Sequence, residues 1–189
     1  MGYTTDFYGT FKFNKPVTEE LKTYINKFSE TRRMTRDNET IKLLYPNWKD
    51  LCFNGNLGIN GAYFIGGEGF CGQNHDASIL DYNFPGNQPG LWCQWIINDE
   101  GELEWDQNEK FYHYVEWLEY LITHFFEPLG YVLNGDVEYQ GEDSDDFGKI
   151  VVTNNKIEVI EGKQVYGLED FSDDELIDEL YRRGYHEIH

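Results

Sequence analysis

The sequence has few cysteines, few basic residues and no long apolar run. Its three cysteines, Cys52, Cys71 and Cys93, form no CxxC pair, so they indicate free thiols in a reducing compartment. No stretch of 18 apolar residues is present, which argues against a membrane-spanning helix. The first residues, MGYTTDFYGTF, lack the basic start and apolar core of a signal peptide. We therefore expect a cytoplasmic protein without a membrane partner.

Basic residues are scarce, with 15 Lys and Arg against 35 Asp and Glu, which gives a net charge of −20. The excess of acidic residues lies after residue 50. Residues 51–189 hold 6 Lys or Arg and 28 Asp or Glu, a net charge of −22. A surface of this sign repels phosphate backbones and anionic lipid, and it attracts basic proteins. We expect a basic protein partner and no direct contact with nucleic acid. The alternative is that the charge serves solubility alone.

Catalytic, cofactor and metal motifs are missing. The sequence has no GxSxG, P-loop or HExxH motif, and its glycine-rich GGEGFCG lacks the GxGxxG spacing that opens a nucleotide-binding helix. The segment EDSDDFG does not match a calcium-binding EF-hand, because Phe147 and Asn154 stand where Asp or Asn and then Glu are required. These absences predict no cofactor and no metal, and they favour a binding protein over an enzyme.

Hydrophobic periodicity predicts an α+β domain with a single antiparallel or mixed sheet. Residues 3–13 alternate with a period of two, as in a half-buried strand, and Thr18 is placed to cap an N-terminal helix. LWCQWII (91–97) predicts a strand buried on both faces, and ELEW (102–105) a second strand. A β-meander follows residue 130, with a hairpin turn at Asn154-Asn155.

The strongest helical pattern covers residues 107–127, for which Asp106 and Glu109 form a candidate capping box. We expect one long helix to pack across the sheet through a wide apolar stripe. The stripe consists of Phe111, Tyr114, Val115, Leu118, Leu121, Ile122, Phe125 and Phe126.

The chain divides into three predicted parts: an α+β domain (1–162), a linker (163–171) and a C-terminal helical appendage (172–189). Ser172 and Glu175 match a second capping box, and Phe171 with Leu176 matches the hydrophobic staple that accompanies it. We expect this helix to dock on its own domain or on another molecule.

A candidate ligand site combines the basic island TRRMTR with a loop and a strand. Guanidinium groups bind phosphates and carboxylates bidentately, and a histidine beside carboxylates can bind a metal or transfer protons. The alternatives are internal ion pairs for the arginines, an ordered loop at 72–83 and a core position for the tryptophan. The candidate residues are Arg32, Arg33, Arg36, His75, Asp76, Asp81, Trp92 and Gln94.

A candidate partner surface consists of carboxylates in the acidic half of the chain. One group lies in a predicted hairpin loop and the other in the first turn of the C-terminal helix. The candidate residues are Glu142, Asp143, Asp145, Asp146, Asp173 and Asp174.

Several segments resemble a family of uncharacterised proteins in phage and bacterial genomes. They are GYTTDF, TRRM, HDASILDYN, QPGLWCQW, KFYHYVEWLEYLI and GYVLNGDVEYQGED, which together extend over residues 2–153. The resemblance implies a source but no activity, and the C-terminal helix lies outside it.

Three functions remain open at this point. The first is an acidic, non-enzymatic binding protein: a phage-type inhibitor or accessory protein, with an anti-defence role, that engages a basic, nucleic-acid-handling protein. The second is an enzyme or ligand-binding domain with a pocket built from residues 31–36, 72–83 and 92–95. The third is an assembly role for the C-terminal helix. We rank them in this order.

Overall fold

The computed structural model describes residues 2–66, 76–163 and 172–184, and it confirms an α+β fold. Six strands form an antiparallel sheet in the order β4-β5-β1-β6-β7-β8. Their bounds are β1 Thr5–Phe13, β4 Trp95–Ile97, β5 Leu103–Trp105, β6 Leu133–Gly141, β7 Phe147–Thr153 and β8 Lys156–Glu161. The sheet is not single, because β2 (Thr35–Arg36) and β3 (Ile79–Asp81) pair separately.

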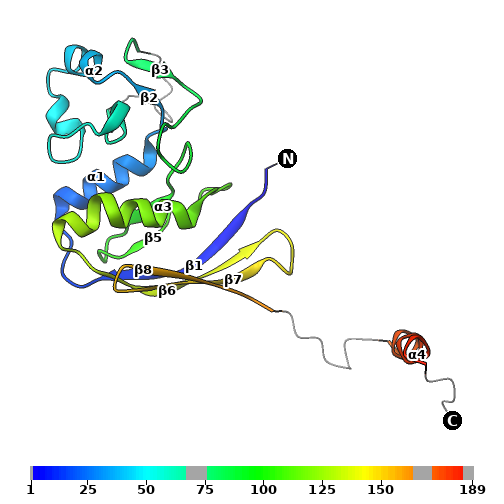
Figure 1. The fold of residues 1–189 in the computed structure, drawn as a ribbon. Helices are drawn as coiled ribbons and strands as arrows, with labels where there is room; N and C mark the ends of the chain where they lie inside the picture. Colours follow the sequence, from blue (N-terminus) through cyan, green and yellow to red (C-terminus); the bar gives the residue numbers. More distant parts are fainter. Residues whose placement is uncertain (1, 67–75, 164–171, 185–189) are drawn as a thin grey trace.

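The described residues form four α-helices. They are α1 (Glu19–Glu30), α2 (Asn38–Leu44), α3 (Tyr114–Leu121) and α4 (Asp173–Arg182), with short turns η1 (Trp48–Leu51), η2 (Ile59–Gly61), η4 (Ile122–Phe126) and η5 (Glu127–Leu129). α1 and α3 cover one face of the sheet, and α2, β2 and β3 form a layer beyond them (Figure 1). Within the described residues, no helix covers the opposite face. None of the described helices is long and apolar enough to cross a membrane.

Aromatic rings fill the space between the helices and the sheet. Phe7 and Phe11 of β1 both make edge-on contacts with Trp95 of β4. Phe125 contacts the rings of Tyr24 and Phe28 on α1. The period-two pattern predicted for β1 is confirmed, since Phe7 and Phe11 are buried while Tyr8 and Lys12, on the other face, are exposed.

Leu118→Ala is expected to lower the free energy of unfolding by about 2–5 kcal/mol, because Leu118 is fully buried in the core and its loss leaves a cavity. Urea unfolding measures the change. The control is Leu43→Ala on α2, whose leucine is 81% exposed and should matter little. A loss below about half a kcal/mol for Leu118→Ala would show that α3 presents another face to the sheet.

The prediction of one helix over 107–127 is wrong at its start. α3 begins at Tyr114, and Gln107, Lys110 and His113 before it have positive φ angles of 65°, 63° and 58°. A right-handed helix cannot continue through such residues. Asp106 therefore accepts the Asn108 N–H in a local turn instead of capping a helix. After α3 the chain widens into one π-helical turn, η4, and then tightens into η5.

The strand predicted for 91–97 is also shorter than expected. Only Trp95–Ile97 pair with β5, because the preceding backbone groups bond elsewhere. The Leu91 carbonyl accepts the Arg33 N–H at 2.9 Å, and the Cys93 carbonyl accepts the Ser29 hydroxyl at 2.7 Å.

The predicted termini of other elements are confirmed. The Thr18 side chain caps α1, Asn154 and Asn155 form the β7–β8 turn with φ angles of 50° and 66°, and Ser172 with Glu175 forms the capping box of α4. α4 has no buried residue and stands apart from the sheet in Figure 1. Phe171 and the linker over 163–171, apart from Lys163, lie outside the described residues. The division into domain, linker and appendage stays a prediction.

Candidate functional site

Arg33 of the basic island is buried, with 2% of its surface exposed. Its guanidinium donates to the carbonyls of Thr31 and Phe64 at 2.8 and 3.1 Å and lies over the Phe28 ring. Burial lowers the pKa of Arg33 to about 10, so the side chain remains cationic at neutral pH. Arg33 therefore ties the segment before β2 to the segment after η2, and it does not present its charge to solvent.

Arg36 is buried beside a carboxylate from the far side of the loop. Its Nη1 lies 2.9 Å from Asp76 Oδ2 and donates to Ser78 Oγ at 2.7 Å, while the Tyr45 hydroxyl also donates to Asp76. Burial raises the pKa of Asp76, but the hydrogen bonds from Ser78 and Arg36 outweigh this effect and lower the pKa to about 2. The pair holds β2 against β3 as an internal ion pair.

Arg32 is the arginine that reaches the surface. Its guanidinium lies 4.3 Å from the centre of the Tyr82 ring and 5.8 Å from that of Trp92, and it donates to Asn83 Oδ1. Asp81 is exposed and accepts the Asn83 N–H. These side chains form a small aromatic and polar surface beside β3.

Gln94 does not share this surface. It is buried, donates to the Glu109 carbonyl at 3.1 Å and accepts from Trp105 Nε1 at 3.2 Å. Gln94 thus fixes the turn-rich segment before α3 against β4 and β5. Trp92 and Gln94 both precede β4, so neither lies on the strand predicted over 91–97.

The structure thus divides the eight predicted ligand-site residues into separate groups. Arg36 pairs with Asp76, Arg32 lies with Trp92 near Asp81, and Arg33 and Gln94 are each buried in different contacts. His75 lies outside the described residues. Within the described part of the chain, no three His, Cys, Asp or Glu side chains gather as a metal-ion site.

The clefts of the molecule lie elsewhere. One of about 820 Å³ runs between α1 and residues 49–55. Lys15, Lys27 and Lys49 line it together with Tyr24 and Tyr131. Glu19, Glu20 and Asp50 also line it, so its charge is balanced. Lys15 already donates to the Leu129 carbonyl at 2.7 Å and stacks on Tyr131, which leaves the cleft without a concentrated charge of either sign.

A partly buried polar cluster that the sequence did not indicate lies above α3. The Tyr63 hydroxyl and His124 Nδ1 are hydrogen-bonded at 3.0 Å, and Gln88 Nε2 lies 3.3 Å from the Tyr120 hydroxyl. Burial lowers the pKa of His124 and raises the pKa of Tyr120 to about 12, so both are neutral at neutral pH. The cluster joins segments far apart in the chain, so no local pattern could have predicted it.

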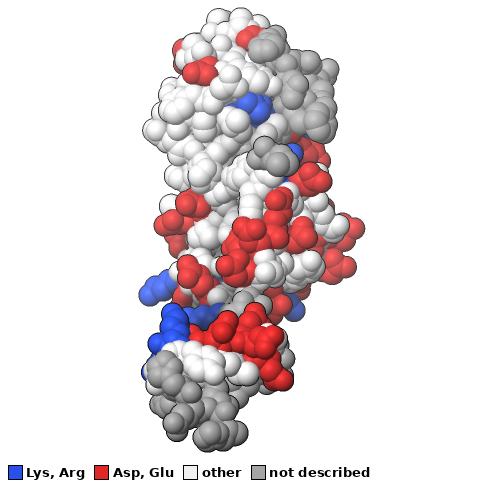
Figure 2. Space-filling view, turned by 90° about the vertical axis from the view of Figure 1, so that its right-hand side faces the viewer, with Lys and Arg blue, Asp and Glu red and all other residues white. Residues whose placement is uncertain are grey.

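The predicted acidic hairpin is the β6–β7 turn. Glu142, Asp143 and Asp145 are exposed and Asp146 is partly exposed. Among the described residues, none of the four has a Lys, Arg or His partner within salt-bridge distance. Figure 2 views the side from which this turn projects, where acidic side chains gather across the middle of the molecule.

The N-terminal segment holds this turn in place. The Tyr3 hydroxyl donates to Asp146 Oδ2 at 2.6 Å and accepts the Asp143 N–H at 3.2 Å, while the Thr4 N–H donates to Glu142 Oε1 at 2.8 Å. The hydrogen bond to Asp146 raises the pKa of Tyr3. These bonds hold the backbone of the turn and the carboxylates of Glu142 and Asp146 in place before any partner arrives.

The uncovered face of the sheet adds carboxylates that the sequence-based site left out. Asp6, Asp136 and Glu138 point to this face, since their neighbours in β1 and β6 are buried on the other. Lys149 is paired with Asp136 and Glu138 at 2.9 and 3.4 Å. The period-two pattern of residues 134–140 was the signal available for these residues.

The other predicted acidic residues, Asp173 and Asp174, lie exposed in the first turn of α4. Asp and Glu at a helix N-terminus stabilise the helix dipole, so part of their role is local.

Comparison with known proteins gave no match: no protein-family model, no curated protein and no solved structure is significantly similar to this chain.

Proposed function

We propose that this chain is an acidic, non-enzymatic binding protein that engages a basic protein partner. The observation that carries the proposal is the ordered β6–β7 turn, in which four carboxylates lie within five residues and lack cationic partners among the described residues. Surplus charge on an ordered surface attracts an oppositely charged partner and accelerates its association.

A nucleic-acid-handling protein is the partner class we favour. Such proteins carry basic surfaces that bind phosphates, and duplex DNA presents one negative charge per roughly 1.7 Å of its axis. Rows of carboxylates on the turn and on the open sheet face offer charge of the same sign. An inhibitor or accessory role would follow from competition for that basic surface.

The alternative ligand pocket has less support. Arg33 and Arg36 are occupied by internal contacts, Gln94 is buried, and the wide cleft is lined by other residues. Only Arg32, Asp81 and Trp92 remain at the surface near one another, and they form no enclosed site in the described part of the chain.

The proposal is tested by capturing partners from a host lysate at low salt and identifying them by mass spectrometry. The expected result is retention of a basic protein. Its affinity for the chain should decrease as the salt concentration is raised from 50 to 500 mM, because screening weakens the attraction between exposed charges (Debye length about 10 Å at 0.1 M). A partner affinity that does not change with salt concentration, or tight binding of the chain to duplex DNA, would contradict the proposal.

The triple variant Glu142→Gln, Asp143→Asn and Asp145→Asn is expected to weaken binding of that partner about tenfold or more at low salt. The control removes the same charge from residues that line the wide cleft, through Glu19→Gln, Glu20→Gln and Asp50→Asn. Titration calorimetry compares the two. Equal losses would show that net charge, and not the ordered turn, attracts the partner.

A further inference from the structure

The two edges of the large sheet differ in how they are protected. At the β4 edge, α1 supplies polar side chains: Asn26 Nδ2 donates to the Ile97 carbonyl at 3.0 Å, and Asn26 Oδ1 accepts the Ile97 N–H at 2.8 Å. Just before β4, Ser29 donates to the Cys93 carbonyl. This edge cannot accept another strand without displacing these bonds.

Among the described residues, none covers the β8 edge in this way. β8 pairs with β7 in a regular ladder of six residue pairs, from Thr153–Lys156 to Gly148–Glu161, without a bulge. No described residue outside β7 forms a hydrogen bond to a backbone group of β8. Six residues without proline or bulge make a straight edge, and edge strands of this kind pair readily with other chains.

The hydrogen-bond pattern identifies the free groups. The Gly162 N–H donates to the Phe147 carbonyl at 2.7 Å, and bonded and non-bonded positions alternate along an antiparallel pair. Lys156, Glu158 and Ile160 therefore bond to β7. Ile157, Val159 and Glu161 direct their N–H and C=O groups away from the sheet.

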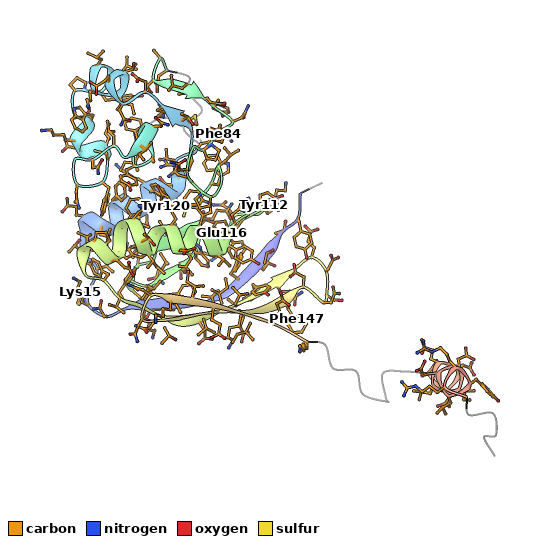
Figure 3. The ribbon with its side chains drawn as sticks, in the orientation of Figure 1. Lys15, Phe84, Tyr112, Glu116, Tyr120 and Phe147 are labelled. Carbon is orange, nitrogen blue, oxygen red and sulfur yellow. The ribbon has the colours of Figure 1, made fainter. Side chains whose placement is uncertain are left out.

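Apolar side chains are exposed on both faces of the same strand. Val159 lies on the helix side, opposite buried Ile150, and is 43% exposed. Ile160 lies on the uncovered face, opposite Lys149, and is 48% exposed. Figure 3 places Phe147, at the start of β7, near the end of the sheet where β8 finishes, and Lys15 at the opposite end. The C-terminal end of β8 thus lies at the same end of the sheet as the acidic turn, and the first residues of β8 lie at the opposite end.

We propose that the free edge of β8 is a docking site for an extended, basic segment of the partner protein, which adds to the sheet as a further strand. The inference rests on the proposed function and names its binding mode. Backbone hydrogen bonds to Ile157, Val159 and Glu161 provide affinity, as in other cases of strand addition. On the uncovered face, Lys or Arg residues of the segment meet Glu158, and on the helix side its apolar residues meet Ile157 and Val159.

Charge favours a basic segment over a second copy of this chain. Two β8 strands that pair about a two-fold axis through residue 158 place Glu158 opposite Glu158, and like charges directly opposite destabilise a strand pair. A register centred on Val159 avoids this contact but still brings together two chains of net charge −20.

The experiment uses the full chain and two synthetic peptides of the same composition. In the first, acetyl-KVKVKVK-amide, lysine and valine alternate. In the second, acetyl-KKKKVVV-amide, the lysines and the valines are grouped. The two charges are therefore equal, but only the first peptide has the period-two pattern of a strand. Fluorescence anisotropy measures affinity at low salt, and NMR measures amide hydrogen exchange. We expect the alternating peptide to bind about tenfold tighter and to slow the exchange of the Ile157, Val159 and Glu161 amides.

Val159→Pro is the decisive variant, because proline removes an N–H that points away from β7 and leaves the β7–β8 ladder bonded. It should abolish the preference for the alternating peptide, whereas Val159→Thr, which keeps the N–H, should retain it. Thermal unfolding reports whether the proline variant is folded. If it is not, amide exchange in the unaltered chain decides the question.

The outcomes are distinguishable. Salt-sensitive binding of both peptides without slower exchange at these three amides overturns edge docking and leaves the acidic binding function intact. Failure of both peptides to bind at low salt contradicts the proposed function as well. Protection that appears without peptide and grows with protein concentration identifies a second copy as the occupant and overturns the proposal.

Discussion

Asp76→Asn is expected to lower the free energy of unfolding by about 3–5 kcal/mol. The reason is the Arg36 guanidinium, whose side chain is only 3% exposed and has its ion-pair partner in Asp76. Removal of the carboxylate leaves a buried charge uncompensated, which costs more than the pair contributes when intact. Urea unfolding at neutral pH measures the loss, and Asp81→Asn is the control, since Asp81 is exposed and pairs with no described cation.

The same variant has a defined pH dependence. The pKa of Asp76 is about 2, below its ordinary value of 3.8, so the folded state binds its proton less readily than the unfolded state. The contribution of Asp76 to stability is therefore full above pH 4 and is lost as the pH falls towards 2. We expect the difference between the wild type and Asp76→Asn to shrink over this window. A difference that stays constant from pH 5 to pH 2 would contradict the ion-pair interpretation.

Arg33→Ala is expected to lower the free energy of unfolding by about 3–5 kcal/mol, because it opens a cavity beside Phe28 and leaves the Thr31 and Phe64 carbonyls without their donor. Arg33→Lys should recover little, since an ammonium cannot span two carbonyls as the planar fork does. The adjacent Arg32→Ala is the matched control, and its loss should be at most about 1 kcal/mol for a partly exposed side chain.

These arginine variants separate structure from recognition. The sequence alone leaves it open whether the three arginines clamp an anionic ligand or act as internal counter-charges. The structure assigns Arg33 and Arg36 to internal contacts and leaves Arg32 at the surface beside Tyr82 and Trp92. If Arg33→Ala kept full stability but lost partner binding, the ligand-site hypothesis would replace the acidic surface as the better explanation of function.

Local chemistry was sufficient to predict several elements of this chain. The period-two alternation of residues 5–13 gave β1, the capping residues Thr18, Ser172 and Glu175 gave the starts of α1 and α4, and Asn154-Asn155 gave the β7–β8 turn. Each of these depends on groups within a few residues, where the backbone preference is decided by the nearest side chains.

Positions that depend on distant partners were predicted poorly. The apolar stripe at 111–126 identified the core face of the helix, but the backbone before Tyr114 follows turns that are held by Gln94 and Trp105. The strand at 91–97 was shortened for the same reason, since Arg33 and Ser29 take its carbonyls. Hydrophobic periodicity carries no information about such contacts.

The sequence by itself determined the fold class, the acidic charge and the main capping and turn positions, because composition and local hydrogen bonding suffice for them. Only the tertiary structure decided which charges are free. It buried Arg33 and Arg36, and it placed Tyr3 against the β6–β7 turn through Asp146. Asn26 closes the β4 edge, whereas no described residue covers the β8 edge. The energy of a charge or a backbone group depends on its burial and its partners, and both are set by residues far away in the chain.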